Sequence, residues 1–410
     1  MASRQLRNFG ERLVEGLLTL SGSFTSLTIL LIVVFLFKEG AGLFSSPSVE
    51  SGYTLVVHPS NPISSLDPTT IKKIFDEEIT SWHQIPAYGL TNPASPIHTF
   101  RFDEIFSLYS DTELGGDDYP LLSDKLSSVV YNDPSIIAFL PQRFLIKDFR
   151  TKHLPTPSIS LSHFFLGSQW LPTATPSPLF GLLPLIAGTL WVSFFAILIA
   201  LPFGVGVAVY LSELAGDKTR KTLKPAIELL AGIPSVVYGF FGLVALVPLI
   251  QHTFNLPVGE TALAGALVLA IMALPTIITI AEDSLRTVPN IMRESSLALG
   301  ASRWQTIYRV VVPCAASGIT AAVVLGIGRA VGETMAVLMV TGNAAIIPTS
   351  LTDSVRTIPA TIAAELGEAP TAGAHYQALF MLGCILFLLT MLISLAAELI
   401  TKRQLTHKGI

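Results

Sequence analysis

The chain has 410 residues, of which 50% are hydrophobic and only 13% are charged, and its mean hydropathy is +0.61. In a soluble protein about a quarter of all residues are charged. This composition therefore excludes an ordinary soluble enzyme and indicates several membrane-spanning helices. The formal net charge of −4 identifies no partner, because the distribution of charge among the loops matters more than its sum in a membrane protein.

The apolar runs predict six membrane-spanning α-helices, since about 20 residues cross the hydrocarbon core. The first span is expected at 16–37, after a polar N-terminal stretch. We do not interpret the N-terminus as a cleavable signal peptide, because its apolar run is long enough to span the membrane. The other five are expected at 182–211, 226–250, 261–281, 314–341 and 376–400. The fold class expected is therefore an all-α polytopic membrane protein.

Between the first two spans lies a polar insert, 41–178, in which charged residues, Pro, Asn and Ser return. Its length is that of one domain. Residues 56–66 are typical of a strand followed by a turn, and Asp67 is a suitable N-cap for a helix that begins at Pro68. We expect an α/β domain here, so that 1–40 forms the N-terminus and first span, and 179–410 forms the main transmembrane domain.

The short loops predict how the chain is oriented in the membrane. Loops 212–224 and 282–309 carry four Lys or Arg residues each, whereas loop 251–260 has none and loop 342–375 has only Arg356. By the positive-inside rule, both termini lie in the cytoplasm and the insert lies outside it. The location expected is the bacterial cytoplasmic (inner) membrane.

The polar stretch 293–313 is unusual for its position between two long apolar runs. Pro289 suits the start of a helix, and Gly300 suits the left-handed residue just past its end. Ser302 is a plausible N-cap for a second turn, and Pro313 is expected to break or kink the run. A short helix with small side chains, held between two spans, can seat in a groove on another protein.

The spacing within this stretch resembles the motif of binding-protein-dependent ABC importers, which is EAA, three residues, Gly, nine residues and Ile-x-Leu-Pro. Glu294, Ser295 and Ser296 stand at the EAA positions, followed by Gly300 and then by Val310, Val312 and Pro313. The resemblance implies that 290–303 is a coupling helix that docks into an ATPase subunit. The alternative is an ordinary solvated loop.

Segments 180–215, 232–243 and 328–337 resemble phosphate importer permeases, and the last resembles the PstC type more than the PstA type. The resemblance covers 180–400 well and the first 40 residues weakly. It implies a permease for inorganic phosphate that pairs with a PstA-type permease, two ATPase subunits and an external phosphate-binding protein.

Arg329 and Glu333 lie in the middle of the fifth expected span, four residues apart, so on an unbroken helix they share one face. A charge at that depth costs roughly 2.5–3.5 kcal/mol on insertion scales unless it is paired or faces water. One interpretation is that Arg329 meets the transported anion in the pathway while Glu333 limits how tightly it is held. The other is a static ion pair that fixes helix packing. Glu228 in the third expected span, and Glu282 and Asp283 just after the fourth, are expected to be solvated or capping groups.

The insert contains a second resemblance, because 58–85 and 129–141 are similar to segments of phosphate-binding proteins. Those proteins carry an Arg-x-x-Ser-Gly-Thr loop that holds the anion at a helix N-terminus. Here Arg101 is present but Ser-Gly-Thr does not follow it. We expect a partial domain of this type that docks or gates, with a working receptor as the alternative.

The sequence contains no GxxxxGK[ST] motif, no catalytic constellation and no metal-ligand spacing. We therefore expect no enzyme activity and no cofactor in this chain, with ATP and Mg²⁺ bound by the partner ATPase. Three other functions remain open: a permease for molybdate, sulfate or phosphonate, a membrane sensor with an external domain, and a carrier driven by an ion gradient.

Overall fold

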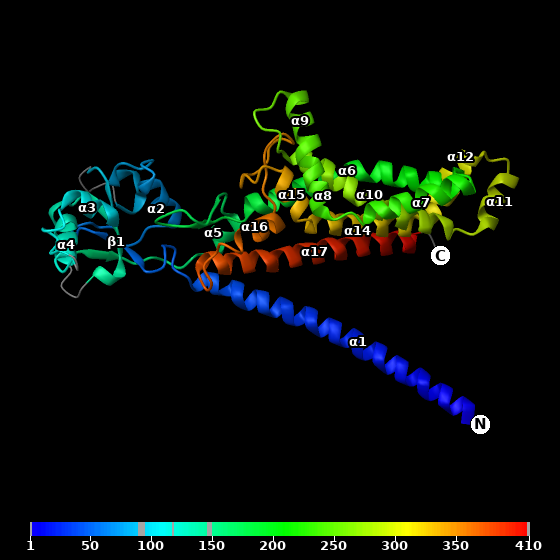
Figure 1. The fold of residues 1–410 in the computed structure, drawn as a ribbon, viewed down its shortest axis with the longest axis horizontal. Helices are drawn as coiled ribbons and strands as arrows, with labels where there is room; N and C mark the ends of the chain where they lie inside the picture. The colour runs from blue at the N-terminus through cyan, green and yellow to red at the C-terminus, as the bar shows by residue number, and fades with distance from the viewer. Residues whose placement is uncertain (1, 89–94, 117–118, 146–149, 408–410) are drawn as a thin grey trace. The chain divides into compact units, whose positions relative to one another are not determined.

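The computed structural model describes residues 2–88, 95–116, 119–145 and 150–407 (Figure 1). The chain divides into two compact units. A helical unit comprises Met1–Ala41, Pro184–Ala369 and Gln377–Ile410, and a mixed α/β unit comprises Gly42–Leu183 and Pro370–Tyr376.

Long helices make up most of the helical unit, and several of them are interrupted. They are α1 (Ala2–Ala41), α6 (Leu183–Val209), α7 (Asp217–Ala231), α8 (Ser235–Phe241), α9 (Val247–Phe254), α10 (Ala262–Arg286), α11 (Asn290–Ala298), α12 (Arg303–Thr306), α13 (Val312–Cys314), α14 (Ala316–Gly332), α15 (Met335–Val340), α16 (Ile358–Glu365) and α17 (Ala374–His407). Single π-helical turns at Tyr210–Leu214, Gly242–Leu246 and Ile307–Val311 widen the helices at three of these interruptions.

Five helices within the described residues are long and apolar enough to cross a membrane, and a sixth span is present if one bent pair is counted. The five are Glu15–Ser45, Leu183–Leu214, Ser235–Phe254, Ala262–Arg286 and Ala374–Ala396. The bent pair is Arg303–Cys314 and Ala316–Gly332, whose axes differ by 68°. The prediction of a mostly helical membrane protein is confirmed, with six spans as the upper count.

Two of the predicted spans have the wrong limits. The third was expected to begin at residue 226, but α7 is a separate exposed helix that ends at Ala231, and the spanning helix begins after Pro234. Proline has no backbone N–H to continue a helix, which accounts for the break. The fifth span was expected to continue to 341, but α14 ends at Gly332 and α15 starts at Met335.

Small residues allow α10 and α14 to pack closely. Ala322, Gly326 and Ala330 of α14 are buried in the bundle. A Cβ atom built on Gly326 would lie 3.0 Å from Ile277 of α10, and one on Gly318 would lie 2.0 Å from Ser284. Position 318 therefore needs glycine, and position 326 leaves little room for a larger residue, as expected where two membrane helices approach at short range.

The α/β unit has a four-stranded sheet in the order β2-β3-β1-β4. Its strands are β1 (Tyr53–Val57), β2 (His98–Arg101), β3 (Ile136–Pro141) and β4 (Lys152–Leu154). β1 is antiparallel to β3 and β4, and β2 is parallel to β3. A second sheet pairs β5 (Trp170–Leu171) with β6 (Leu179–Phe180).

Side chains along β1 alternate between the two faces of the sheet, and each face has its own hydrophobic core. Leu55 and Val57 pack with residues of α2 (Pro68–Phe75), whereas Val56 packs with residues of α4 (Leu122–Asn132). This is the period of two that a strand imposes. Asp67 caps α2 as predicted, because its carboxylate accepts a hydrogen bond from the backbone N–H of Thr70 at 3.0 Å. The unit also contains two shorter α-helices, α3 (Ile105–Leu108) and α5 (Leu161–Leu166).

Candidate functional site

The helix α11 protrudes at one end of the helical unit, next to α12 and at the same end as α7 (Figure 1). It ends in the backbone geometry that the sequence predicts, since Gly300 has φ +86°. The Gly300 N–H bonds to the Leu297 carbonyl at 2.9 Å, and the Ala301 N–H bonds to the Ser296 carbonyl at 3.2 Å. This pair of bonds is the Schellman motif, which satisfies the last carbonyls of a helix.

A capping box starts α12 immediately afterwards. The Ser302 hydroxyl accepts from the Gln305 N–H at 3.2 Å, and the Gln305 side chain accepts from the Ser302 N–H at 2.9 Å. The prediction of Ser302 as an N-cap is confirmed. A hydrogen bond of 2.9 Å between the hydroxyls of Ser296 and Thr306 joins α11 to α12. The turn between the two helices is therefore held at several points.

Several large apolar side chains in and just after α11 are exposed. Ile291 is 70% exposed and Leu299 is 89% exposed. A groove of about 480 Å³ runs between α11 and the segment that follows it, lined by Ile291, Met292, Ser295, Ser296, Leu299, Ala301, Gln305, Arg309 and Val310. Exposed apolar surface next to a groove is typical of a protein–protein contact.

The five residues predicted for coupling do not all share one surface. Ser295 and Ser296 line the groove. The Glu294 side chain is exposed, and no ion pair is found for it among the described residues. Gly300 shapes the turn. Pro313 lies two residues before the 68° bend that separates α13 from α14, as the expected kink requires.

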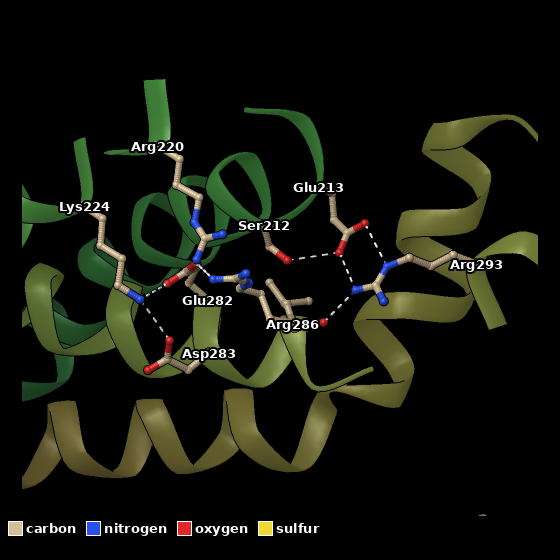
Figure 2. Close-up of polar contacts among 9 residues, drawn as sticks. Ser212, Glu213, Arg220, Lys224, Glu282, Asp283, Arg286 and Arg293 are labelled. Atoms are coloured by element: carbon tan, nitrogen blue, oxygen red, sulfur yellow. Dashed lines mark hydrogen bonds and ion pairs between the residues drawn. The ribbon is translucent and has the colours of Figure 1, made fainter. Parts of the chain in front are cut away.

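The sequence interpretation missed the residue that fixes the base of α11, which is Arg293. Its guanidinium forms a bidentate ion pair with Glu213, with Nη2–Oε1 at 2.7 Å and Nε–Oε2 at 3.2 Å (Figure 2). Glu213 lies in the π-helical turn that follows α6. Nη2 also donates to the Leu285 carbonyl at 2.8 Å, and Nη1 donates to the Val288 carbonyl. One side chain of α11 thus contacts the ends of two other helices, α6 and α10.

A second charged cluster surrounds Glu282, whose side chain is 1% exposed. Its carboxylate lies 2.7 Å from Nη2 of Arg220 and 2.6 Å from Nζ of Lys224, with Arg286 at 3.8 Å (Figure 2). The expectation of a solvated or capping group is therefore wrong for Glu282. The hydrogen bond to Glu282 raises the pKa of Lys224 above its usual value, despite the opposing effect of burial. The Lys224 contribution to stability is thus present at neutral pH and is lost only as the pH rises through this raised pKa.

Replacing Glu282 with Gln should lower the free energy of unfolding by roughly 3 kcal/mol, because it leaves Arg220 and Lys224 without their buried counter-charge. Thermal unfolding of the protein in detergent would measure the change. Asp283→Asn is the matched control, since Asp283 contacts the same lysine at 3.0 Å but is 61% exposed, so its loss should cost about 1 kcal/mol or less. Equal effects of the two substitutions would contradict a buried hub at Glu282.

Arg329 and Glu333 do not share one helix face. α14 ends at Gly332, and Glu333 has an extended backbone (φ −71°, ψ 132°). The Glu333 carboxylate accepts from the Ala336 N–H at 3.3 Å and so caps α15. No Arg329–Glu333 ion pair is found among the described residues. Arg329 instead donates from Nη1 to the Thr276 hydroxyl at 3.3 Å.

The surface of α14 next to Arg329 is open. Gly328 and Gly332 are exposed, and a Cβ atom at either position would meet nothing within 4 Å. The opposite row of small residues, Gly326 and Ala330, is the one that packs in the bundle. The guanidinium therefore lies at the border between the packed and the open side of this helix.

In the α/β unit, the Arg101 side chain is engaged by its neighbours. Its guanidinium lies 5.3 Å from the centre of the Phe75 ring and donates to the Thr175 hydroxyl at 3.2 Å. The following helix, α3, has only four residues, and Asp103 and Glu104 precede it. Two carboxylates at this position oppose the binding of an anion.

Residues 200–406 match the family model described as "Binding-protein-dependent transport system inner membrane component". The chain belongs to this family. The match extends from α6 to α17 and so includes α11, its groove and Arg329. The protein is a multi-pass inner-membrane permease subunit of an ABC importer and is not itself an ATPase.

The chain aligns with most of the length of several related proteins. The chain is 40% identical over 246 residues to the "Probable ABC transporter permease protein YqgH" of Bacillus subtilis, covering 60% of this chain and 79% of that protein. It is 40% identical over 259 residues to the "Phosphate transport system permease protein PstC" of Mesorhizobium japonicum, covering 58% and 78%. Among solved structures, a chain of the inward-facing MetNI methionine ABC transporter aligns with a TM-score of 0.41 and 23% identity, covering 55% of this chain and 94% of that one.

Proposed function

We propose that this chain is the PstC-type permease subunit of an importer for inorganic phosphate. The observation that carries the proposal is the 40% identity to a phosphate transport permease over 78% of that protein's length. A PstA-type permease would form the other half of the pathway. Two ATPase subunits and an external phosphate-binding protein would complete the complex.

In this proposal the end of the helical unit with α7 and α11 lies in the cytoplasm, as do both termini. Its support is the concentration of Lys and Arg in the loops at that end. The exposed surface of α11 and its groove then dock on an ATPase subunit. ATP binding shifts the equilibrium between inward-open and outward-open states, because the ATPase subunits contact α11 differently in each.

Arg329 is proposed to meet the anion as it crosses. Its position in the last turn of α14, beside the open glycine surface of that helix, supports this role. Glu333, which caps α15, is proposed to keep the anion from being held too tightly, since a like charge nearby weakens its binding.

For the domain at 41–178, we propose docking or gating rather than phosphate binding, on the side of the membrane opposite to α11. Replacing Arg101 with Ala should therefore leave the KM for phosphate uptake unchanged. The reason is that the guanidinium is already occupied by Phe75 and Thr175 and lies beside two carboxylates. Uptake kinetics in vesicles would measure it, and a clear rise in KM would support a working receptor instead.

The function itself is tested by uptake of labelled phosphate into sealed vesicles that contain the whole complex. Competition by unlabelled molybdate, sulfate and phosphonate identifies the anion that the permease prefers. Net accumulation excludes a pure sensor, and accumulation that needs ATP but no ion gradient excludes a gradient-driven carrier. Stronger competition by another oxyanion than by phosphate would overturn the assignment.

A further inference from the structure

We infer that Arg293 and Glu213 form a positioning pair that makes α11 move as one body with the ends of α6 and α10. The inference rests on the proposed role of α11 in coupling. It concerns how a displacement of α11 reaches the spans, which the docking of α11 does not by itself explain.

The contacts of Arg293 reach two segments outside α11, the turn after α6 and the end of α10. The ion pair to Glu213 connects positions 80 residues apart and joins α11 to the turn after α6. The bonds to the carbonyls of Leu285 and Val288 join it to the end of α10. The side chains of Arg293 and Glu213 are only 18% and 10% exposed, so solvent screens the pair weakly.

A second contact of α11 connects it to α12 and α14 rather than to α6 and α10. The Ser296–Thr306 hydrogen bond joins its C-terminal end to α12, and from there the chain continues through the 68° bend to α14. Among the described residues, no other side chain of α11 forms an ion pair. Without Arg293, a displacement of α11 would reach α14 along the chain, and it would reach the end of α6 only through the apolar cluster that contains Val209, Val288 and Ile307. Among the described residues, no other polar side-chain contact joins α11 to the end of α6.

Geometry at Glu213 indicates why an arginine is needed. Glu213 also accepts from the Ser212 hydroxyl at 3.0 Å (Figure 2). The π-helical turn is closed by a bond of 2.8 Å from the Ala215 N–H to the Tyr210 carbonyl. The acceptor is thus held in one orientation. A planar guanidinium can bond it at two points and still reach two carbonyls, which a lysine ammonium cannot do.

The test uses Arg293→Lys and Glu213→Gln in the assembled complex, reconstituted in vesicles. Each variant should co-purify with its partners as wild type does, but should hydrolyse more ATP per phosphate transported, by about tenfold, the ratio that a loss of about 1.4 kcal/mol gives. A merely structural role would lower the amount of complex and leave this ratio unchanged. Glu228→Gln is the matched control, because this residue is exposed, lies outside α11 and its groove, and no ion pair is found for it among the described residues.

A second readout does not depend on the transported anion. Spin labels are placed at Gly216→Cys and Ala298→Cys, both exposed positions, with Cys314 replaced by Ser and Cys384 by Ala. The distance between the labels should be the same with and without ATP when Arg293 is present, and should change with ATP in the Arg293→Lys variant. If that variant fails to assemble, Glu213→Gln decides the outcome.

The two readouts separate this inference from the proposed function. A wild-type complex that does not transport phosphate would refute the phosphate assignment, and the label distances would still test the positioning pair. Wild-type ratios and wild-type label distances in both variants would overturn the inference.

Discussion

Replacing Arg329 with Gln should abolish phosphate uptake while the complex still assembles. The guanidinium is a charge within a span, and among the described residues its polar contact is one hydrogen bond to Thr276 at 3.3 Å. Arg329 lies in the last turn of α14 and no ion pair is found for it among the described residues, so removing its charge should not lower stability. Uptake by vesicles and the melting temperature in detergent would measure both effects.

The control for this prediction is Thr276→Val, which removes the hydrogen-bond partner of Arg329 and leaves its charge in place. Because the anion is attracted by the charge, we expect this variant to retain most of its uptake. Normal uptake by Arg329→Gln would eliminate the proposed contact with the anion. A large fall in melting temperature would instead support a static role in helix packing.

Replacing Gly300 with Val should prevent the ATPase subunits from assembling with the permease. Gly300 has φ +86°, a conformation that costs an L-residue about 1–2 kcal/mol and is least accessible to a β-branched side chain. The strain would displace the turn between α11 and α12, and with it the groove that Ser295 and Ser296 line. Co-purification of the ATPase subunits and vesicle uptake would measure the loss.

Gly300→Asn separates backbone strain from loss of contact, since Asn tolerates the left-handed conformation better than other residues. A Cβ atom at this position meets nothing within 4 Å in this chain, so a clash can come only from a partner. If Asn restores assembly, the backbone conformation is what matters; if it does not, the surface is in direct contact.

Glu294→Arg tests the charge of the exposed surface of α11. Undiminished assembly and uptake in both Gly300→Val and Glu294→Arg would contradict docking at α11.

Local signals predicted the elements around α11 well. The Schellman turn at Gly300, the capping box at Ser302 and the bend after Pro313 all depend on residues that are close in the sequence. The same was true of the cap at Asp67. Limits of the spans were less predictable, because hydropathy alone does not show that Gly232–Pro234 separates α7 from α8.

The features of the candidate site also separate into those that the sequence predicts and those that depend on the tertiary structure. Sequence alone determined the helical membrane class, the family resemblance and the position of the exposed helix, because these follow from composition, spacing and backbone preferences of neighbouring residues. Only the tertiary structure decided that Arg293 binds Glu213, that Glu282 is enclosed by three cations, and that Arg329 and Glu333 lie on separate segments. The Arg293–Glu213 pair joins residues 80 positions apart, and the Lys224–Glu282 pair joins residues 58 positions apart. Their energies depend on how helices pack and how much water is excluded, which no local pattern specifies.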